Sequence, residues 1–77
     1  MQVEISLFGH FRRLLRDTDG RLTLTVIEGT TVRDVLKMVR VPEAEVGPVS
    51  VNAQLATVET PLRDGDRVCV FAPIGGG

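Results

Sequence analysis

Apolar and polar side chains alternate in two stretches of the first half of the chain, residues 2–8 and residues 21–27. Side chains two positions apart lie on the same face of a strand, so each stretch predicts a half-buried strand. Phe8 falls on the polar side of the first alternation. The predicted core faces are aliphatic: Val3, Ile5 and Leu7 in the first strand, and Leu22, Leu24 and Val26 in the second.

Two other stretches have apolar residues at helical spacing. Residues 10–17 predict a short helix, and residues 31–40 (TVRDVLKMVR) carry the i, i+3, i+4, i+7 stripe of an amphipathic helix. Thr31 and Asp34 have the spacing of a capping box, in which each side chain bonds the backbone amide of the other residue. Pro42 is expected to stop this main helix, because the residue before a proline disfavours helical geometry.

The second half of the chain predicts three more strands. Residues 48–54 form the third and residues 67–72 the last, with a connecting stretch at residues 56–62 that contains a brief fourth strand. The whole order indicates an α+β fold, a ubiquitin-like β-grasp. Its mixed sheet of four to five strands has the main helix packed across it, and its first and last strands are neighbours. We expect one domain, residues 1–71, and a flexible glycine-rich C-terminal tail, residues 72–77.

Length and charge exclude several functions. A chain of 77 residues buries only about 60% of its unfolded surface, which leaves little room for a deep active site. The formal net charge of -1 argues against binding to nucleic acid, and the local basic run HFRRLLR is expected to be the solvated face of a helix. No apolar run has the length of a membrane span, and the alternating, acidic start does not resemble a signal peptide, so we expect a cytoplasmic protein with no membrane partner.

Catalytic and metal-binding side chains are scarce. The single Cys69 and the single His10 predict neither an internal disulfide nor a metal site, and no phosphate-binding loop or nucleophile elbow is present. We therefore expect a non-enzymatic protein with no bound cofactor. Cys69 is expected to be an outward or half-buried strand residue, with the alternative that it accepts sulfur as a persulfide. His10 is expected to be solvated or to cap a strand end.

The sequence FAPIGGG, which begins within the last predicted strand and runs to Gly77, suggests a role for the main chain itself. Six extended residues from Ala72 to Gly77 reach at most about 20 Å, and glycine, which lacks a Cβ, fits a narrow channel. Ordering six residues costs on the order of 6–12 kcal/mol of backbone entropy, which Pro73 reduces by fixing one angle. The folded body must therefore supply an anchoring surface.

Strand parity predicts where this surface lies. Val68 and Val70 point to the core, so Phe71 lies on the opposite face, as Phe8 does on the neighbouring first strand. The two rings, joined by Leu55, would form an exposed apolar patch at the root of the tail. The alternative is that both rings are partly buried at a sheet edge or under the tail.

Several segments together resemble the MoaD/ThiS family of ubiquitin-like sulfur carriers, over nearly the whole chain. These are the capped TVRDVL helix, VN in the third strand, and LRDGDRVCVF running into a proline and a terminal Gly-Gly. The opening LFGHFRRL and the F-x-P entry to the tail are closer to the molybdopterin synthase small subunit. Phe8, Leu55 and Phe71 match partner-facing positions of those carriers. Gly75 departs from the family, in which alanine or another small side chain is common there.

The resemblance implies that the Gly77 carboxylate is adenylated with ATP by an E1-like adenylyltransferase (MoeB/ThiF-like) and becomes a thiocarboxylate. The sulfur would come from a cysteine desulfurase or rhodanese. It would pass to a precursor held by a synthase large subunit (MoaE-like), into which Pro73, Ile74, Gly75 and Gly76 thread. Molybdopterin is the expected product. The alternatives are a carrier for thiamin thiazole or tRNA thiolation, or a modifier that joins Gly77 to lysines of target proteins.

Overall fold

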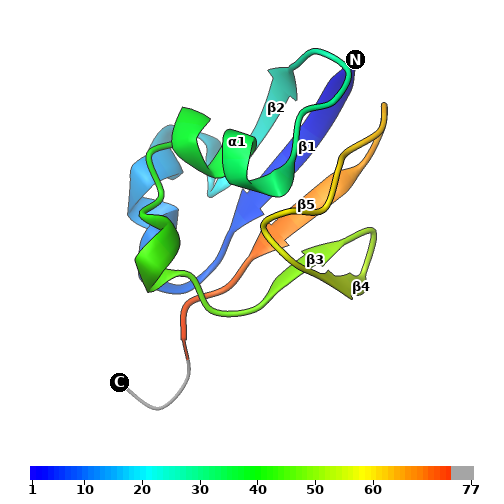
Figure 1. Ribbon diagram of the computed structural model, residues 1–77. Helices are drawn as coiled ribbons and strands as arrows, with labels where there is room; N and C mark the ends of the chain where they lie inside the picture. Colours follow the sequence, from blue (N-terminus) through cyan, green and yellow to red (C-terminus); the bar gives the residue numbers. More distant parts are fainter. Residues whose placement is uncertain (74–77) are drawn as a thin grey trace.

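The computed structural model describes residues 1–73, and within residues 16–18 it describes the backbone alone. Five strands form one sheet in the order β2-β1-β5-β3-β4 (Figure 1). The strands are β1 (Gln2–Leu7), β2 (Arg21–Thr25), β3 (Val49–Val51), β4 (Gln54–Ala56) and β5 (Arg67–Val70). The helices are α1 (Val32–Met38) and two 3-10 helices, η1 (Gly9–Thr18) and η2 (Glu43–Glu45).

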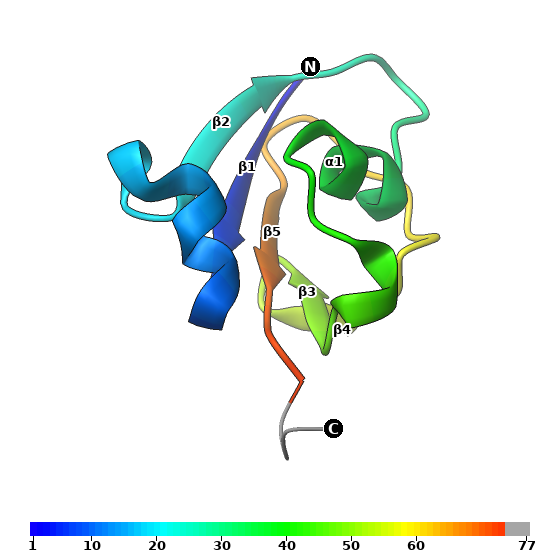
Figure 2. The same cartoon turned by 90° about the vertical axis from the view of Figure 1, so that its left-hand side faces the viewer.

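The sheet is mixed, with the first and last strands side by side at its centre. β1 pairs in parallel with β5 and antiparallel with β2, while β3 is antiparallel to both β5 and β4. α1 lies across one face of this sheet (Figure 2). The ubiquitin-like β-grasp that the sequence predicts is confirmed, including the neighbouring position of the first and last strands.

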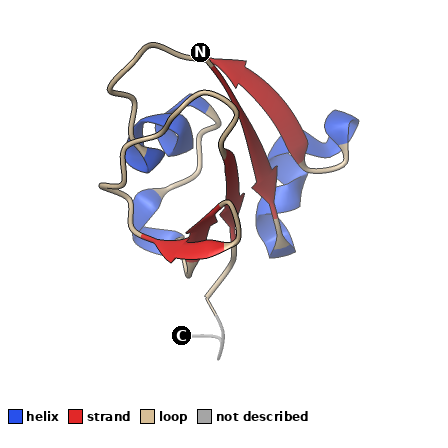
Figure 3. Ribbon diagram, turned by 90° about the vertical axis from the view of Figure 1, so that its right-hand side faces the viewer, coloured by secondary structure: helices blue, strands red, loops and turns tan. Residues whose placement is uncertain are grey.

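The core lies between the sheet and the helices, which are on the same side of it (Figure 1). Val68 and Val70 of β5 are fully buried, as their parity predicts. Among the described residues, no helix or strand covers the opposite face of the sheet (Figure 3). The buried apolar residues are Val3, Ile5, Leu7, Phe11, Val26, Val32, Val35, Leu36, Val39, Val41, Val49, Leu62, Val68 and Val70.

α1 begins as the sequence predicts. The Asp34 N–H donates to the Thr31 hydroxyl (3.4 Å), and the Asp34 carboxylate accepts from the Thr31 N–H (3.0 Å), which completes a capping box. These bonds satisfy amides that the first helical turn leaves without a partner.

The end of α1 differs from the prediction. The helix stops at Met38 because Arg40 adopts a left-handed backbone (φ 63°), which lets the Val41 N–H reach the Leu36 carbonyl at 2.9 Å and the Arg40 N–H reach the Lys37 carbonyl at 3.1 Å. This is the Schellman arrangement, usually made with glycine. The helix is therefore already closed before Pro42.

The prediction of one strand over residues 48–54 is wrong. Asn52 and Ala53 have positive φ (52° and 68°), so the chain reverses there in a two-residue turn, and the fourth strand is Gln54–Ala56 rather than part of residues 56–62. Residues at the start of β5 stabilise this turn. The Asn52 side chain accepts a hydrogen bond from the Arg67 N–H (2.9 Å) and donates one to the Asp66 carboxylate (2.8 Å).

Residues 57–62 form a loop that closes the start of α1. The Val32 N–H donates to the Thr60 carbonyl (3.0 Å), and the Arg33 N–H donates to the Val58 carbonyl (2.8 Å). The stretch in which the sequence predicts a strand is therefore a loop, and its carbonyls accept hydrogen bonds from the first amides of α1. Among the described residues, no helix is long and apolar enough to cross a membrane.

Candidate docking site

Two phenylalanines stack against each other where β1 and β5 end. The ring centroids of Phe8 and Phe71 are 4.8 Å apart and the planes differ by 12°. Both rings remain accessible, with 41% of Phe8 and 37% of Phe71 exposed. Their backbones are fixed by hydrogen bonds, from the Phe8 N–H to the Val70 carbonyl and from the Phe71 N–H to the Pro48 carbonyl, each 3.0 Å. The result is a rigid aromatic pair on the uncovered face.

Leu55 lies on the same face but on another strand. Strand register places Ser6, Cys69, Ser50 and Leu55 side by side in one row across β1, β5, β3 and β4. Leu55 is thus two strands from β5, about 10 Å away at the usual strand spacing, and it is 85% exposed. The structure brings the two rings together and leaves Leu55 as a separate apolar contact on that face.

Cys69 and His10 lie near the aromatic pair. Cys69 is a half-buried free thiol in the row between Ser6 and Ser50. His10 is exposed at the start of η1, and its ring is tilted against that of Phe11 with centroids 4.3 Å apart. No hydrogen bond or ion pair joins either side chain to another described side chain as a catalytic pair would require.

The root of the tail is fixed to the body at a position that the sequence analysis missed. The Gly47 N–H donates to the Phe71 carbonyl at 2.8 Å, and Ala72 packs half-buried against the core. The signal in the sequence is the Gly47-Pro48 dipeptide before β3, in which the pattern predicts Gly47 as loop and Pro48 as the first residue of the third strand. Pro73 is exposed, and it is the last described residue.

Four of the predicted tail residues, Ile74, Gly75, Gly76 and Gly77, lie outside the described residues. The role predicted for the Gly77 carboxylate stays a prediction.

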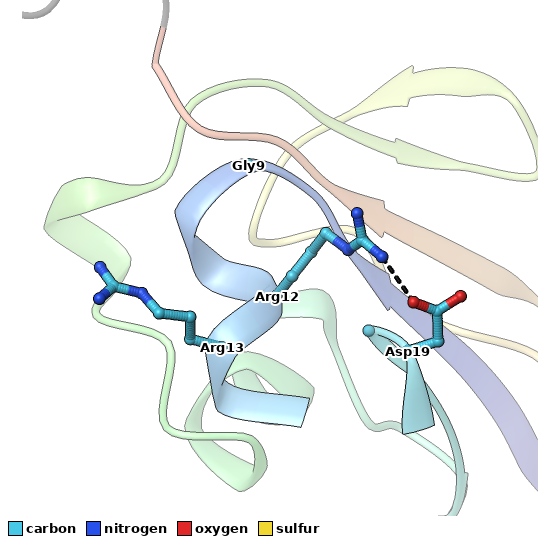
Figure 4. Close-up of a pocket in the computed structure, with 5 residues that line it drawn as sticks. Gly9, Arg12, Arg13 and Asp19 are labelled. Carbon is cyan, nitrogen blue, oxygen red and sulfur yellow. Dashed lines mark hydrogen bonds and ion pairs between the residues drawn. The ribbon is translucent and has the colours of Figure 1, made fainter. Parts of the chain in front are cut away.

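A cleft at the start of η1 is the other candidate for a site. It has a volume of about 360 Å³ and is lined by Gly9, Arg12, Arg13, Asp19 and Gly20. Figure 4 shows Arg12 reaching across to Asp19, with which it forms an ion pair, while Arg13 extends to the other side of the helix. Exposed pairs of this kind contribute little free energy. The two cations do not converge on one point, so the cleft is a weak candidate for an anion site.

Other signs of a bound ligand are absent from residues 1–73. Among the side chains that the structure describes, those of residues 1–15 and 19–73, no three from His, Cys, Asp or Glu come together as a metal site would require. Every fully buried polar side-chain atom described there has a hydrogen-bond partner. The stacked Phe8–Phe71 pair on the uncovered face is therefore the candidate site, as an apolar docking surface.

The fold and this face define a small ubiquitin-like protein with an aromatic patch where its last strand gives way to the tail. The chain belongs to the ThiS family, whose family model matches residues 5–77. Members of this family are small ubiquitin-like proteins that are generally non-catalytic carriers. A search of curated proteins gave no match.

Solved structures with the same fold cover almost the whole chain. A Pyrococcus furiosus protein assigned as molybdopterin converting factor, subunit 1, is 25% identical with a TM-score of 0.75, over 96% of this chain and 99% of that one. SAMP1, a small archaeal modifier protein of Haloferax volcanii, is 22% identical with a TM-score of 0.75, and both chains are fully covered. Subunit 1 in the Helicobacter pylori complex of molybdopterin-converting factor subunits 1 and 2 is 20% identical, with a TM-score of 0.64 and full coverage of both chains. The last two similarities show the fold alone.

Proposed function

We propose that the chain is a sulfur carrier in which the terminal carboxylate of Gly77 is the working group and residues 1–71 are the docking body. The observation that supports this best is the position of the stacked Phe8–Phe71 pair. The pair lies on the uncovered face, directly before the residues that lead to the glycines, in a chain of the ThiS family. A partner that binds the rings thereby also holds the root of the tail.

The proposed chemistry has two steps. In an E1-like adenylyltransferase, a Gly77 carboxylate oxygen attacks the α-phosphorus of ATP, a P–O bond forms, and pyrophosphate leaves. Hydrosulfide sulfur then attacks the acyl carbon, so that a C–S bond forms, the C–O bond to AMP breaks, and a thiocarboxylate remains. A persulfide donor, as on a cysteine desulfurase or rhodanese, also requires a thiol that reduces the resulting S–S bond.

We propose molybdopterin synthesis as the destination of the sulfur, with the large subunit of a synthase as the acceptor partner. The support is the likeness to the Pyrococcus furiosus protein assigned as subunit 1 of molybdopterin converting factor. The Helicobacter pylori complex gives an example in which a protein of this fold is bound to a second subunit. In that arrangement Phe8, Phe71 and Leu55 would face the large subunit while Pro73 to Gly77 enter it.

The test is an intact-mass measurement after incubation with the E1-like enzyme, ATP and a sulfur donor. We expect the mass change of one oxygen replaced by sulfur at the C-terminus. A variant with one alanine added after Gly77 should keep the wild-type circular dichroism spectrum and Tm but gain no sulfur. Thiolation of the extended variant, or none of the wild type with an enzyme that activates it, would contradict the proposal.

The second candidate is a protein modifier, favoured by the full-length match to SAMP1. It uses the same activation, but a lysine amine of a target attacks the acyl carbon and an isopeptide bond replaces the bond to AMP. Affinity-tagged protein recovered from cells under denaturing conditions distinguishes the two. Higher-mass conjugates that contain a Gly77–lysine linkage identify a modifier, and their absence with a thiocarboxylate present identifies a carrier.

A further inference from the structure

The root of the tail passes between two glycines that are far apart in the sequence. A Cβ placed on Gly47 would lie 2.8 Å from the carbonyl carbon and oxygen of Ala72 and 2.8 Å from the Pro73 nitrogen. A Cβ placed on Gly9 would lie 3.0 Å from the Ala72 Cβ. Carbon atoms in good contact are about 3.5–4.0 Å apart, so neither position has room for a methyl group.

The two glycines are required for different reasons. Gly9 has φ +66°, a left-handed conformation that itself favours glycine. The backbone of Gly47 is outside the left-handed region, so its conformation is open to alanine. At residue 47 a side chain is therefore excluded by the backbone atoms of Ala72 and Pro73, and not by the conformation of residue 47 itself.

Hydrogen bonds on both sides of this contact set the direction of the chain. The Phe71 N–H donates to the Pro48 carbonyl (3.0 Å), and the Gly47 N–H donates to the Phe71 carbonyl (2.8 Å). The first bond continues the β5–β3 hydrogen bonding by one residue beyond Val70, and the second joins Gly47 to Phe71 just outside the two strands. The chain thus passes Ala72 with its backbone held by residues 47 and 48, on a path that is open because residue 47 has no side chain.

We propose that Gly47 is a positioning residue, which sets the direction in which the tail leaves the docked body and so places Gly77 in the adenylating site of the partner. This inference rests on the proposed function. Five residues from Pro73 to Gly77 span at most about 18 Å, so a shift of their starting point is carried to the reacting carboxylate. Misplacement of a reacting group by about 1 Å can lower a rate about a hundredfold.

The first test uses Gly47→Ala with the adenylyltransferase that activates the wild-type chain, with ATP-dependent pyrophosphate release as the readout. We expect kcat to fall about tenfold or more. We expect KM for the carrier to change less than about twofold, because the aromatic pair that docks the body is intact. A rise in KM that follows the unfolded fraction, with kcat unchanged, would show a purely structural role and overturn the inference.

Gly29→Ala is the matched control. Gly29 lies in the loop between β2 and α1, and no atom lies within 4 Å of its added Cβ. This loop is at the end of the molecule opposite the C-terminal end of β5 (Figure 1). The φ of +91° at Gly29 makes alanine strained, so this variant should lower Tm. At a temperature where it is fully folded, kcat and KM should equal those of the wild type; a loss of kcat like that of Gly47→Ala would overturn the inference.

A second measurement does not depend on activity. In wild-type protein we expect a nuclear Overhauser effect between the Ala72 methyl and the Gly9 α-protons, and slow exchange of the Gly47 amide. In Gly47→Ala both should be lost while the Phe8–Phe71 ring contacts remain. Retention of both signals in the variant would overturn the inference. If the wild type is not adenylated by any E1-like enzyme, the proposed function fails instead, and the two outcomes are thus distinguishable.

Discussion

Asp34 is held in its charged form at the start of α1. The pKa of its carboxyl is lowered, first by the hydrogen bond from the Thr31 backbone amide and next by the bond from the Thr31 hydroxyl, with smaller help from Lys37 and Arg33. Glu43 also has a lowered pKa, because the Arg33 guanidinium donates two hydrogen bonds to it at 2.7 and 3.2 Å.

The lowered pKa of Asp34 predicts a pH dependence of stability. A group whose pKa is lower in the folded state stabilises the fold above its unfolded pKa, about 4, and this contribution is lost as pH falls through the folded pKa. Asp34→Asn should therefore have a lower Tm than the wild type at pH 7, and the difference should shrink below about pH 4. Thermal unfolding by circular dichroism between pH 3 and pH 7 measures it.

Glu43→Gln is the matched comparison. It removes a second carboxylate with a lowered pKa and leaves the capping box intact. The Tm of Glu43→Gln should therefore still fall on acidification by the amount that the charge of Asp34 contributes. A Tm difference between Asp34→Asn and wild type that is the same at every pH would show that the charge of Asp34 does not act through the cap.

At the scale of the elements, the end of α1 and the β3–β4 turn each depend on a residue that rarely adopts the left-handed backbone required there. Arg40 closes α1 and Ala53 completes the β3–β4 turn, both with positive φ. A non-glycine residue with a Cβ pays about 1–2 kcal/mol in the left-handed region. Surrounding contacts hold the turn, in which the Asn52 side chain donates to Asp66 and accepts from the Arg67 N–H.

Ala53→Gly should therefore stabilise the protein. Asn-Gly is the preferred pair of a two-residue turn with both φ positive, and the removed strain exceeds the entropic cost of glycine. We expect a gain of about 1 kcal/mol in the free energy of unfolding, which raises Tm by about 4–8 °C in a domain of this size. Differential scanning calorimetry and urea unfolding measure the two quantities.

The same substitution at Ala44 is the control. Ala44 is exposed in the 3-10 helix η2 and is not among the residues with positive φ, so Ala44→Gly gains nothing and loses about 0.5–1 kcal/mol. Equal destabilisation by both substitutions would show that the Ala53 backbone is not strained.

The same elements show how far the sequence predicts this fold. The start of α1 could be predicted because Thr31 and Asp34 are three residues apart and their interaction is local. The end of α1 and the turn at Ala53 could not, because neither residue favours a left-handed backbone. At Ala53, tertiary contacts of the neighbouring Asn52 with residues more than ten positions away override the local preference.

At the scale of the whole molecule, strand parity correctly placed Phe8 and Phe71 on one face of neighbouring strands. Their stacking and the separation of Leu55 from them depend on the register of five strands, which the alternation of side chains does not define. The close contact of Gly47 with Ala72 joins residues 25 positions apart, and no local pattern reports it.

The observed exposures limit the free energy that Phe8, Phe71 and Leu55 can contribute to docking. Burial of a large apolar side chain stabilises by about 1.5–3 kcal/mol, but Phe8 and Phe71 keep only 41% and 37% of their surface exposed, which leaves about 1 kcal/mol each. Leu55, 85% exposed, adds about 2 kcal/mol. Their sum is about 4 kcal/mol. Ordering six tail residues costs on the order of 6–12 kcal/mol, at about 1–2 kcal/mol per residue, so docking of these side chains supplies less than the ordering requires.

Body docking alone therefore cannot hold the tail, and contacts within the partner must supply the remainder. Loss of one ring then weakens the whole complex. Phe8→Ala and Phe71→Ala should each raise KM for adenylation about five- to thirtyfold, the equivalent of about 1–2 kcal/mol, with kcat changed less than about twofold. Steady-state pyrophosphate release with the adenylyltransferase measures both constants.

Ile27→Ala is the control for loss of an exposed apolar side chain. Ile27 is 80% exposed and follows β2, whose C-terminal end is opposite the C-terminal ends of β1 and β5 (Figure 1), so its removal should leave KM unchanged. The comparison separates specific docking from general surface hydrophobicity. An equal rise in KM for Ile27→Ala would contradict docking at the aromatic pair, and so would an unchanged KM for the two phenylalanine variants when they are fully folded. A rise confined to the ring variants, together with a fall in kcat confined to Gly47→Ala, would assign binding to the aromatic pair and delivery to the root of the tail.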